Sequence, residues 1–180
     1  YESFLNAVNM AKKAKENTKT KILGSIAPLE DCYSPFKYPG DECAESELSE
    51  LSNWFIDCGV DTILLETMNN LPEIISCLKV LSGCDVRIWL SLNLLDEKHI
   101  LSGETINKVV ESISKYEVSV LMINCNSIEK TNLVLENINA CWNGKWGIYP
   151  NIGLGEPASD GVISNFSSMK DFMDVSRNSA

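Results

Sequence analysis

Short apolar runs alternate with amphipathic helical stretches along the whole chain. Five runs are rich in β-branched and other apolar residues and end in Gly, Pro, Asn or Thr, which predicts strands. These runs are residues 19–28, 60–67, 85–93, 118–126 and 145–153. Between them, apolar residues recur at helical spacing. Three such faces are Leu48, Leu51, Phe55 and Cys58; Leu71, Ile74, Ile75 and Leu78; and Ile106, Val109, Val110 and Ile113. The pattern predicts an α/β fold in which helices cover a parallel sheet.

Five parallel strands form either a complete doubly wound sheet or part of a (β/α)8 barrel, and a complete barrel needs about 250 residues. The chain has 180 residues, which suits a single domain. Its first helix begins at Tyr1 without a capping residue, so we expect a piece of something longer. The segment 29–46 after the first strand is rich in Pro, Gly and acidic residues, which predicts a loop, and loops that follow strands carry the sites of such folds.

The negative net charge of the chain argues against a nucleic-acid partner. It has 15 Lys and Arg against 25 Asp and Glu, a net charge of -10, and its largest basic cluster is Lys12, Lys13 and Lys15. We therefore expect no nucleic-acid partner. No apolar run reaches the roughly 18 residues that cross a bilayer, so we expect no membrane association and a cytoplasmic location.

The cysteines do not form a recognisable framework. There are seven of them, an odd number, and no two are separated by only two to four residues. This spacing excludes a zinc knuckle and argues against a disulfide scaffold, so most of them are expected to be small buried hydrophobic residues. The glycine-rich stretch 153–161 has no helix close enough to bind a pyrophosphate, and there is no Walker loop.

Polar residues gather where the predicted strands end. They are Ser25, Glu66, Thr67, Ser91, Asn93, Asn124, Cys125 and Asn151. The carboxyl ends of parallel strands meet on one face, which is the usual place of binding and chemistry in α/β folds. Three of them, Ser25, Ser91 and Asn93, are also explained by hydrogen bonds to strand-end backbone.

Two of these residues invite a chemical interpretation. Glu66 comes directly after the strand-like run Thr62 to Leu65, so its carboxylate is expected to be buried. A buried carboxylate is costly without a partner. Glu66 therefore either binds an amine of a ligand or accepts hydrogen bonds from backbone N–H groups, for example at a helix start. Cys125 is a buried hydrophobe, a nucleophile paired with the sole histidine, His99, or a metal ligand. A catalytic zinc needs about three protein ligands, and no second and third donor are evident in the chain.

Taken in order, several motifs resemble the homocysteine S-methyltransferase family. They are GSIAPLEDCYSPFKYPGDE, CGVDTILLETMNNLPE, WLSLNL followed by LSGETI, INCN and YPNIG, and they extend over residues 22–153. The resemblance implies a (β/α)8 barrel, here partial, whose strands three to seven are the five predicted strands. It also implies zinc-dependent methyl transfer to the thiol of homocysteine, giving methionine.

The resemblance assigns a role to each matching residue. Cys125 is expected to supply the first of three zinc thiolates, and Glu66 to pair with the ammonium group of homocysteine. Asn124, Asn151 and Ser25 are expected to line the mouth of the barrel, while no residue beyond the metal site is expected to be catalytic. The family's other two ligands lie in a Gly-Gly-Cys-Cys motif that this chain lacks, as it lacks the family's Asp-Gly-Gly turn. The resemblance thus implies one domain, residues 1–180, truncated at both ends, which alone binds zinc poorly and is inactive.

Two departures from the family keep other functions open. Met122 stands where the family usually has Gly, and Ile152, Gly153 and Leu154 replace Ser-Gly-Glu. The resemblance implies a sulfonium or ammonium methyl donor such as S-methylmethionine, S-adenosylmethionine or betaine, and the residues do not discriminate among them. The alternatives are a homocysteine-binding module of a cobalamin-dependent methionine synthase, a non-catalytic barrel that binds an amino acid or a partner, and a small doubly wound binding domain.

Overall fold

The five predicted strands all form, and they are shorter than the apolar runs. The computed structural model describes residues 1–153, 162 and 164–178. Its strands are β1 (Gly24–Ile26), β2 (Thr62–Met68), β3 (Arg87–Leu92), β4 (Val118–Asn124) and β5 (Lys145–Tyr149). The first run was expected to extend over 19–28, but only Gly24–Ile26 pairs with β2, because a strand continues only where a neighbour supplies hydrogen bonds.

Helices occupy the intervals between the strands. They are α1 (Glu2–Ala14), η1 (Pro35–Lys37), α2 (Asp41–Asp57), α3 (Leu71–Leu81), α4 (Ile106–Ile113), α5 (Ile128–Cys141) and α6 (Met169–Asn178). The prediction of a loop over 29–46 is correct only as far as Gly40, because α2 begins at the next residue. Gly40 is the N-cap of α2 and has a φ of 101°. Glycine adopts this conformation without strain, and Asp41 with Glu42 favours a helix start.

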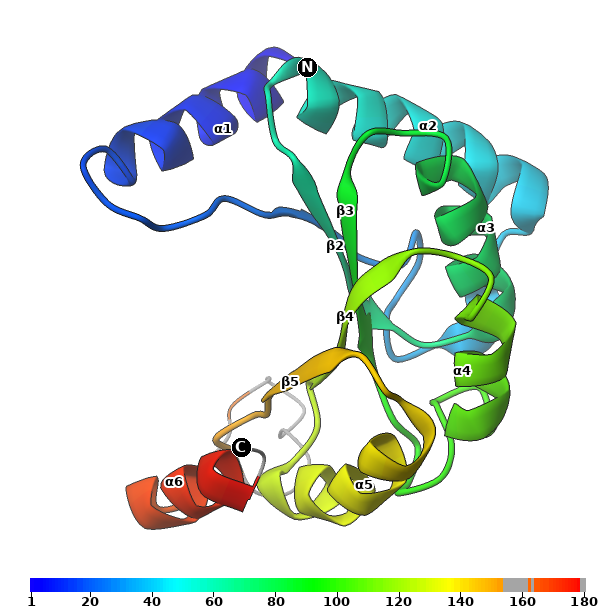
Figure 1. Cartoon of the computed structure of the whole chain (residues 1–180), viewed down its shortest axis with the longest axis vertical. Coiled ribbons are helices and arrows are strands. Elements are labelled where there is room, and N and C mark those ends of the chain that lie inside the picture. The colour runs from blue at the N-terminus through cyan, green and yellow to red at the C-terminus, as the bar shows by residue number, and fades with distance from the viewer. Residues whose placement is uncertain (154–161, 163, 179–180) are drawn as a thin grey trace.

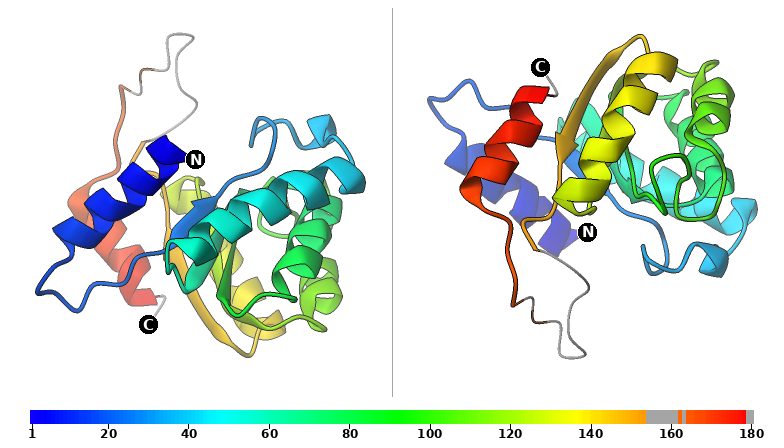
Figure 2. Two further views of the ribbon diagram at one scale, coloured as in Figure 1. Left: turned by 90° about the horizontal axis from the view of Figure 1, so that it is seen from above. Right: turned by 90° about the horizontal axis from the view of Figure 1, so that it is seen from below.

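The strands form one parallel sheet in the order β1-β2-β3-β4-β5. A doubly wound sheet reverses its strand order at a switch point, and this sheet does not. The alternative of a complete doubly wound domain is therefore wrong, and the expected partial barrel is confirmed. Figure 1 shows the sheet as an arc with α2 to α5 on its convex side. Figure 2 shows α1 and α6 toward the open side of the same arc.

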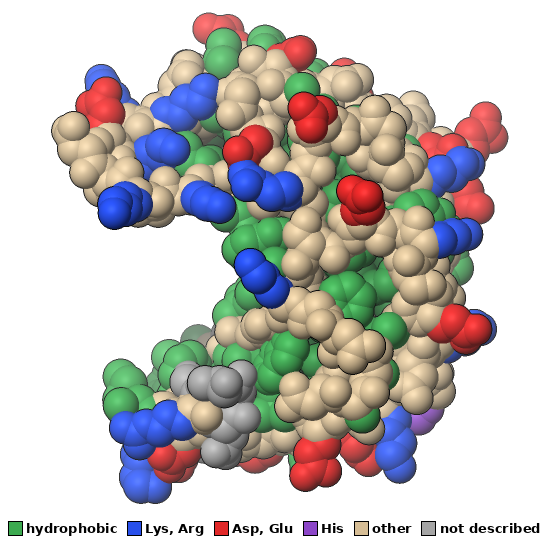
Figure 3. All heavy atoms as spheres, viewed as in Figure 1, with side chains coloured by type: hydrophobic (Ala, Val, Ile, Leu, Met, Phe, Trp, Pro, Cys, Tyr) green, Lys and Arg blue, Asp and Glu red, His purple; other side chains and the backbone are tan. Residues whose placement is uncertain are grey.

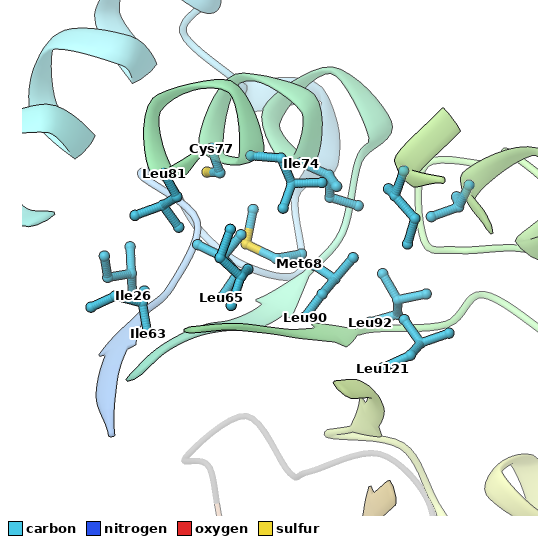
Figure 4. Packing of buried hydrophobic residues seen from close by; sticks show 14 of the residues in the cluster. Ile26, Ile63, Leu65, Met68, Ile74, Cys77, Leu81, Leu90, Leu92 and Leu121 are labelled. Carbon is cyan, nitrogen blue, oxygen red and sulfur yellow. The ribbon is translucent and has the colours of Figure 1, made fainter. Parts of the chain in front are cut away.

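The hydrophobic core lies between the convex side of the sheet and the helices (Figure 4). Alternate strand residues point toward it, including Ile63 and Leu65 of β2 and Leu90 of β3, which are fully buried. From α3, Ile74 and Leu78 meet them and are equally buried. Because successive side chains of a strand point to opposite faces, the residues between them must face the inside of the arc.

The inner face of the sheet is more polar and less covered. Leu64 and Trp89 are half-buried there, and Glu66 follows two residues after Leu64 on the same face. The space-filling view shows the molecule hollowed on this side (Figure 3). The arc therefore presents its strand ends around an open interior, as part of a barrel does.

Three of the helices that follow strands, α3, α4 and α5, begin with side-chain caps. Asn70 accepts a hydrogen bond from the backbone N–H of Glu73 and caps α3, as its position before Leu71 and Pro72 predicts. Thr105 and Ser127 cap α4 and α5 in the same manner. These caps fix where each loop ends and so hold the mouth of the arc in place. Within the described ranges, no helix combines the length and apolar character that crossing a membrane requires.

Candidate functional site

Four of the predicted site residues meet at the carboxyl ends of the strands. Ser25 comes from β1, Glu66 from β2 and Asn124 from β4, and Cys125 directly follows Asn124. Hydrogen bonds join them into two groups, one around the carboxylate of Glu66 and one around the sulfur of Cys125. The sequence placed these residues on one face, and the structure brings them together there.

The carboxylate of Glu66 is bound by two hydroxyl groups. Ser25 donates to Oε2 at 2.5 Å, and the phenol of Tyr149 donates to Oε1 at 3.1 Å. Glu66 is half-buried rather than fully buried, and it is absent from the ion pairs found between described residues. Two donors fix the orientation of the carboxylate, which faces the interior of the arc without an ion-pair partner in the described part of the chain.

A buried amide organises the second group. Asn124 is fully buried, and its Oδ1 accepts a hydrogen bond from Ser91 at 2.6 Å. Its Nδ2 donates to Thr67 Oγ1 at 2.7 Å and to Cys125 Sγ at 3.1 Å. Since the Thr67 hydroxyl already accepts from Asn124, its own hydrogen is available to the Cys125 sulfur, which lies 3.6 Å away. The sulfur thus lies within hydrogen-bonding distance of two polar side chains, which fix its position.

Backbone strain is concentrated at the same place. Thr67 has a φ of 59° and Cys125 a φ of 54°, both in the left-handed region. This region is uncommon for any residue with a side chain and is a genuine outlier for the β-branched Thr67. Such conformations persist when surrounding contacts impose them, and they cluster at functional sites. Here the side chain of Asn124 bonds both strained residues.

Tyr149 belongs to the site, although it was not among the residues predicted from the sequence. It is the last residue of β5 and pairs in register with Asn124 of β4. Burial raises the pKa of its phenol, and the negative charges of Glu66 and Cys125 raise it further, while a hydrogen bond with Ser91 opposes them. The phenol therefore stays protonated at neutral pH and remains a hydrogen-bond donor. The motif YPNIG carried the signal, since an aromatic residue with a polar tip ended the strand.

Cys32 is a second thiol at this mouth that the sequence analysis treated as a buried hydrophobe. It lies on the loop between β1 and α2, and its carbonyl oxygen accepts hydrogen bonds from Asn69 at 2.9 Å and from Asn93 at 3.4 Å. Partial burial raises the pKa of the Cys32 thiol, and the neighbouring Cys125 adds to the rise. A further hydrogen bond fixes this loop, because the backbone N–H of Leu29 donates to the carboxylate of Glu73 at 2.8 Å.

Other predicted groups lie apart from the network. The Asn151 residue is exposed, and its backbone N–H donates to the carbonyl of Asn126 at 2.8 Å. The His99 ring is engaged by Asp96 at 2.8 Å, and no contact in the described part of the chain joins it to Cys125. A Cys/His pair is therefore not formed.

Two of the residues that depart from the family pattern, Met122 and Ile152, are described by the structure. Met122 is half-buried on the inner face of β4, and Ile152 is exposed just after β5. Leu154 lies outside the described residues. Among the described side chains, no group of three or more His, Cys, Asp or Glu is placed to hold a metal ion. Cys125 thus supplies one sulfur donor at the mouth, and a complete thiolate site needs about two more.

Comparisons with known proteins agree with this geometry. The family model described as homocysteine S-methyltransferase matches residues 1–175. The chain is 31% identical over 167 residues to homocysteine S-methyltransferase from Escherichia coli (strain K12), covering 82% of this chain and 53% of that protein. It is 29% identical over 133 residues to betaine-homocysteine S-methyltransferase from Drosophila melanogaster, covering 62% of this chain and 40% of that protein.

A solved structure shows the same arrangement of elements. The metallated form of the homocysteine methyltransferase MmuM from Escherichia coli superposes with a TM-score of 0.78 and 25% identity. The match covers 83% of this chain and 58% of that chain. The chain spans about half the length of the curated relatives it matches.

Proposed function

Because the chain belongs to the homocysteine S-methyltransferase family, we propose that the protein carrying it transfers a methyl group to the thiol of homocysteine, giving methionine. The observation that carries the proposal is that the strand ends bring together two groups, the Glu66 carboxylate, which has no ion-pair partner among the described residues, and the Cys125 thiol. Homocysteine carries an ammonium group at one end and a thiol at the other, so its two ends match these two groups in charge and chemistry.

We propose that Cys125 is one of three thiolate ligands of a zinc ion and that the other two come from residues outside this chain. The donor set supports this in part. The Cys125 sulfur is partly exposed at the mouth, it accepts a hydrogen bond from Asn124, and sulfur is a ligand that zinc favours. A zinc ion held in this way would bind the substrate thiol at an open position and lower its pKa, which supplies a thiolate at neutral pH.

The chain's own residues orient the amino acid and hold the sulfur ligand. Glu66 accepts the substrate ammonium through the carboxylate lone pairs that Ser25 and Tyr149 leave free. Asn124 fixes the Cys125 side chain, and fixed neighbours of this kind orient metal ligands in other proteins. Methyl transfer between two bound molecules then depends on positioning, which can lower a barrier by several kcal/mol. Asn151 is proposed to line the rim of the mouth.

The donor is proposed to be a sulfonium or ammonium compound such as S-methylmethionine, S-adenosylmethionine or betaine. All of these carry a positive charge next to the methyl group, and the charge disappears on transfer. The name of the Drosophila relative specifies betaine for that protein. We propose a reducing, cytoplasmic setting, since the function needs Cys125 as a free thiol and the seven cysteines of the chain are all free.

The test compares metal content and turnover in the full-length protein. Cys125→Ala is expected to lose zinc and methyl transfer together. Glu66→Gln is expected to keep its zinc and to show about a 10- to 100-fold lower kcat/KM for homocysteine, because the negative charge that pairs with the substrate ammonium is lost. Cys43→Ala, at an exposed cysteine, is the matched control and should behave as the unmodified protein.

Several results would contradict the proposal. Stoichiometric zinc and full turnover in Cys125→Ala would exclude Cys125 as a ligand, and tight stoichiometric zinc binding by the 180-residue chain alone would exclude ligands outside it. Binding of homocysteine without transfer from any of the three donors would favour a non-catalytic barrel. Transfer only from a methylated cobalamin would favour the synthase module.

A further inference from the structure

Tyr149 connects parts of the site that come from distant strands. Its side chain belongs to β5, at one edge of the described sheet, yet it donates a hydrogen bond to Glu66 of β2. Ser25, on β1 at the other edge, donates to the second oxygen of the same carboxylate. The curvature of the arc brings the two edges toward each other, so the carboxylate is held from both sides.

The same phenol lies close to the group of residues that holds the sulfur. Tyr149 interacts with the hydroxyl of Ser91, which donates to Asn124 at 2.6 Å. Asn124 in turn donates to the sulfur of Cys125 at 3.1 Å. Tyr149 therefore holds the Glu66 carboxylate, while a separate set of hydrogen bonds from Ser91 through Asn124 holds the cysteine sulfur.

We infer that Tyr149 is a positioning residue that holds the Glu66 carboxylate in place for the substrate ammonium group and so makes the site selective for thiols that carry an amine. This inference rests on the proposed function. Without the phenol hydroxyl, Glu66 Oε1 loses its donor while Oε2 keeps Ser25. The carboxylate can then rotate, and the ammonium contact loses its fixed geometry. Tyr149 acts on the substrate through Glu66 and needs no contact with the reacting sulfur.

The experiment uses two thiols in the full-length protein. Homocysteine and 4-sulfanylbutanoate share the thiol and the carboxylate, but only homocysteine has the ammonium group. Tyr149→Phe keeps the ring and removes the hydroxyl. We expect its kcat/KM for homocysteine to fall about 10-fold, mainly through KM, because a hydrogen bond to a charged group is lost. We expect kcat/KM for 4-sulfanylbutanoate to change less than about 2-fold, because that substrate does not use Glu66.

Two further variants separate positioning from a general structural effect. Tyr116→Phe is the matched control, since Tyr116 packs against the hydrophobic core before β4. It should leave both substrates and the zinc content unchanged. In the Glu66→Gln background, Tyr149→Phe should have no further effect on homocysteine, because the group through which it acts is already altered.

Specific outcomes would overturn the inference. Equal losses for both thiols would place Tyr149 at the sulfur end, and no loss for either would remove it from the site. If Tyr149→Phe does not fold, Ser25→Ala removes the other hydroxyl that holds the Glu66 carboxylate, and Ser25 is exposed. An unchanged preference of Ser25→Ala for homocysteine over 4-sulfanylbutanoate would then refute the inference. Calorimetric binding of both thiols reports on Tyr149 even if the unmodified protein transfers no methyl group, so failure of the proposed function is recognised separately.

Discussion

Replacing Asn124 with Ala tests whether the buried amide holds the site together. The side chain is fully buried and uses both its oxygen and its nitrogen, with Ser91, Thr67 and Cys125 as partners. Its removal leaves two buried hydroxyls without their main partner, and each such loss costs about 1–3 kcal/mol. Because Ser91 still reaches Tyr149 and Thr67 still reaches Cys125, we expect the lower part of that range, about 2–3 kcal/mol in total.

A second effect of Asn124→Ala is expected on metal binding. The lost N–H bond to the Cys125 sulfur leaves that side chain free to rotate, and loss of such neighbours typically weakens metal affinity about 10- to 100-fold. The free energy of unfolding is measured by chemical denaturation of the metal-free full-length protein, and zinc affinity by competition with a chromophoric chelator. Measuring stability without metal keeps the two effects separate.

The control for this pair of measurements is Asn139→Ala, which alters an exposed asparagine on α5. It should change stability by less than about 0.5 kcal/mol and leave zinc affinity as it was. If Asn124→Ala behaves like this control in both assays, the network does not support the site. If it lowers stability but not zinc affinity, Asn124 supports the fold and not the ligand.

Three further perturbations follow from the structure. Gly24→Ala would place a methyl group 2.6 Å from Cδ1 of the Phe55 ring, so we expect a loss of about 1–3 kcal/mol in denaturation experiments; an unchanged midpoint would show that the ring moves freely. Burial raises the pKa of Tyr38 from 10.0 to about 12, so the stability that its neutral form provides is present below about pH 10 and is lost as pH rises toward 12. Denaturation across that interval should show a shallower fall in Tyr38→Phe, and equal slopes would refute the assignment. Iodoacetamide should modify exposed Cys43 before half-buried Cys32, whose pKa is raised, and peptide mass spectrometry would reveal the reverse order.

Local patterns were sufficient to predict the α/β class and the strands, but not whether the sheet is part of a barrel. Runs of β-rich residues placed all five strands, and the helical spacing of apolar residues placed α2, α3 and α4 but did not single out α5. The pattern did not define strand ends, because the length of β1 depends on its pairing with β2 and not on its own residues. It also missed the start of α2, where Gly40 followed by two acidic residues was a helix signal hidden inside a stretch that resembled a loop.

The site was only partly accessible from the sequence. The rule that strand ends meet on one face brought Glu66 and Cys125 forward, because it needs no knowledge of curvature. The contact between Tyr149 and Glu66 could not be derived in this way, since it joins β5 to β2 and depends on how strongly the arc closes. The position of Cys32 depends on side chains that bond its carbonyl, and a loop sequence does not reveal such contacts.

The unusual Met122 fits the site without disturbing it. In the paired strands β4 and β5, Met122 lies opposite Gly147, and Asn124 lies opposite Tyr149 two residues further on. A side chain at Gly147 would place its Cβ 3.2 Å from the Met122 methyl group, so the glycine leaves the room that the methionine fills. The large and small residues thus offset each other in the layer below the polar pair. Since the hydrogen bonds of Asn124 and Tyr149 form in the layer above, Met122 alters the interior beneath the site and gives no reason to prefer a non-catalytic barrel.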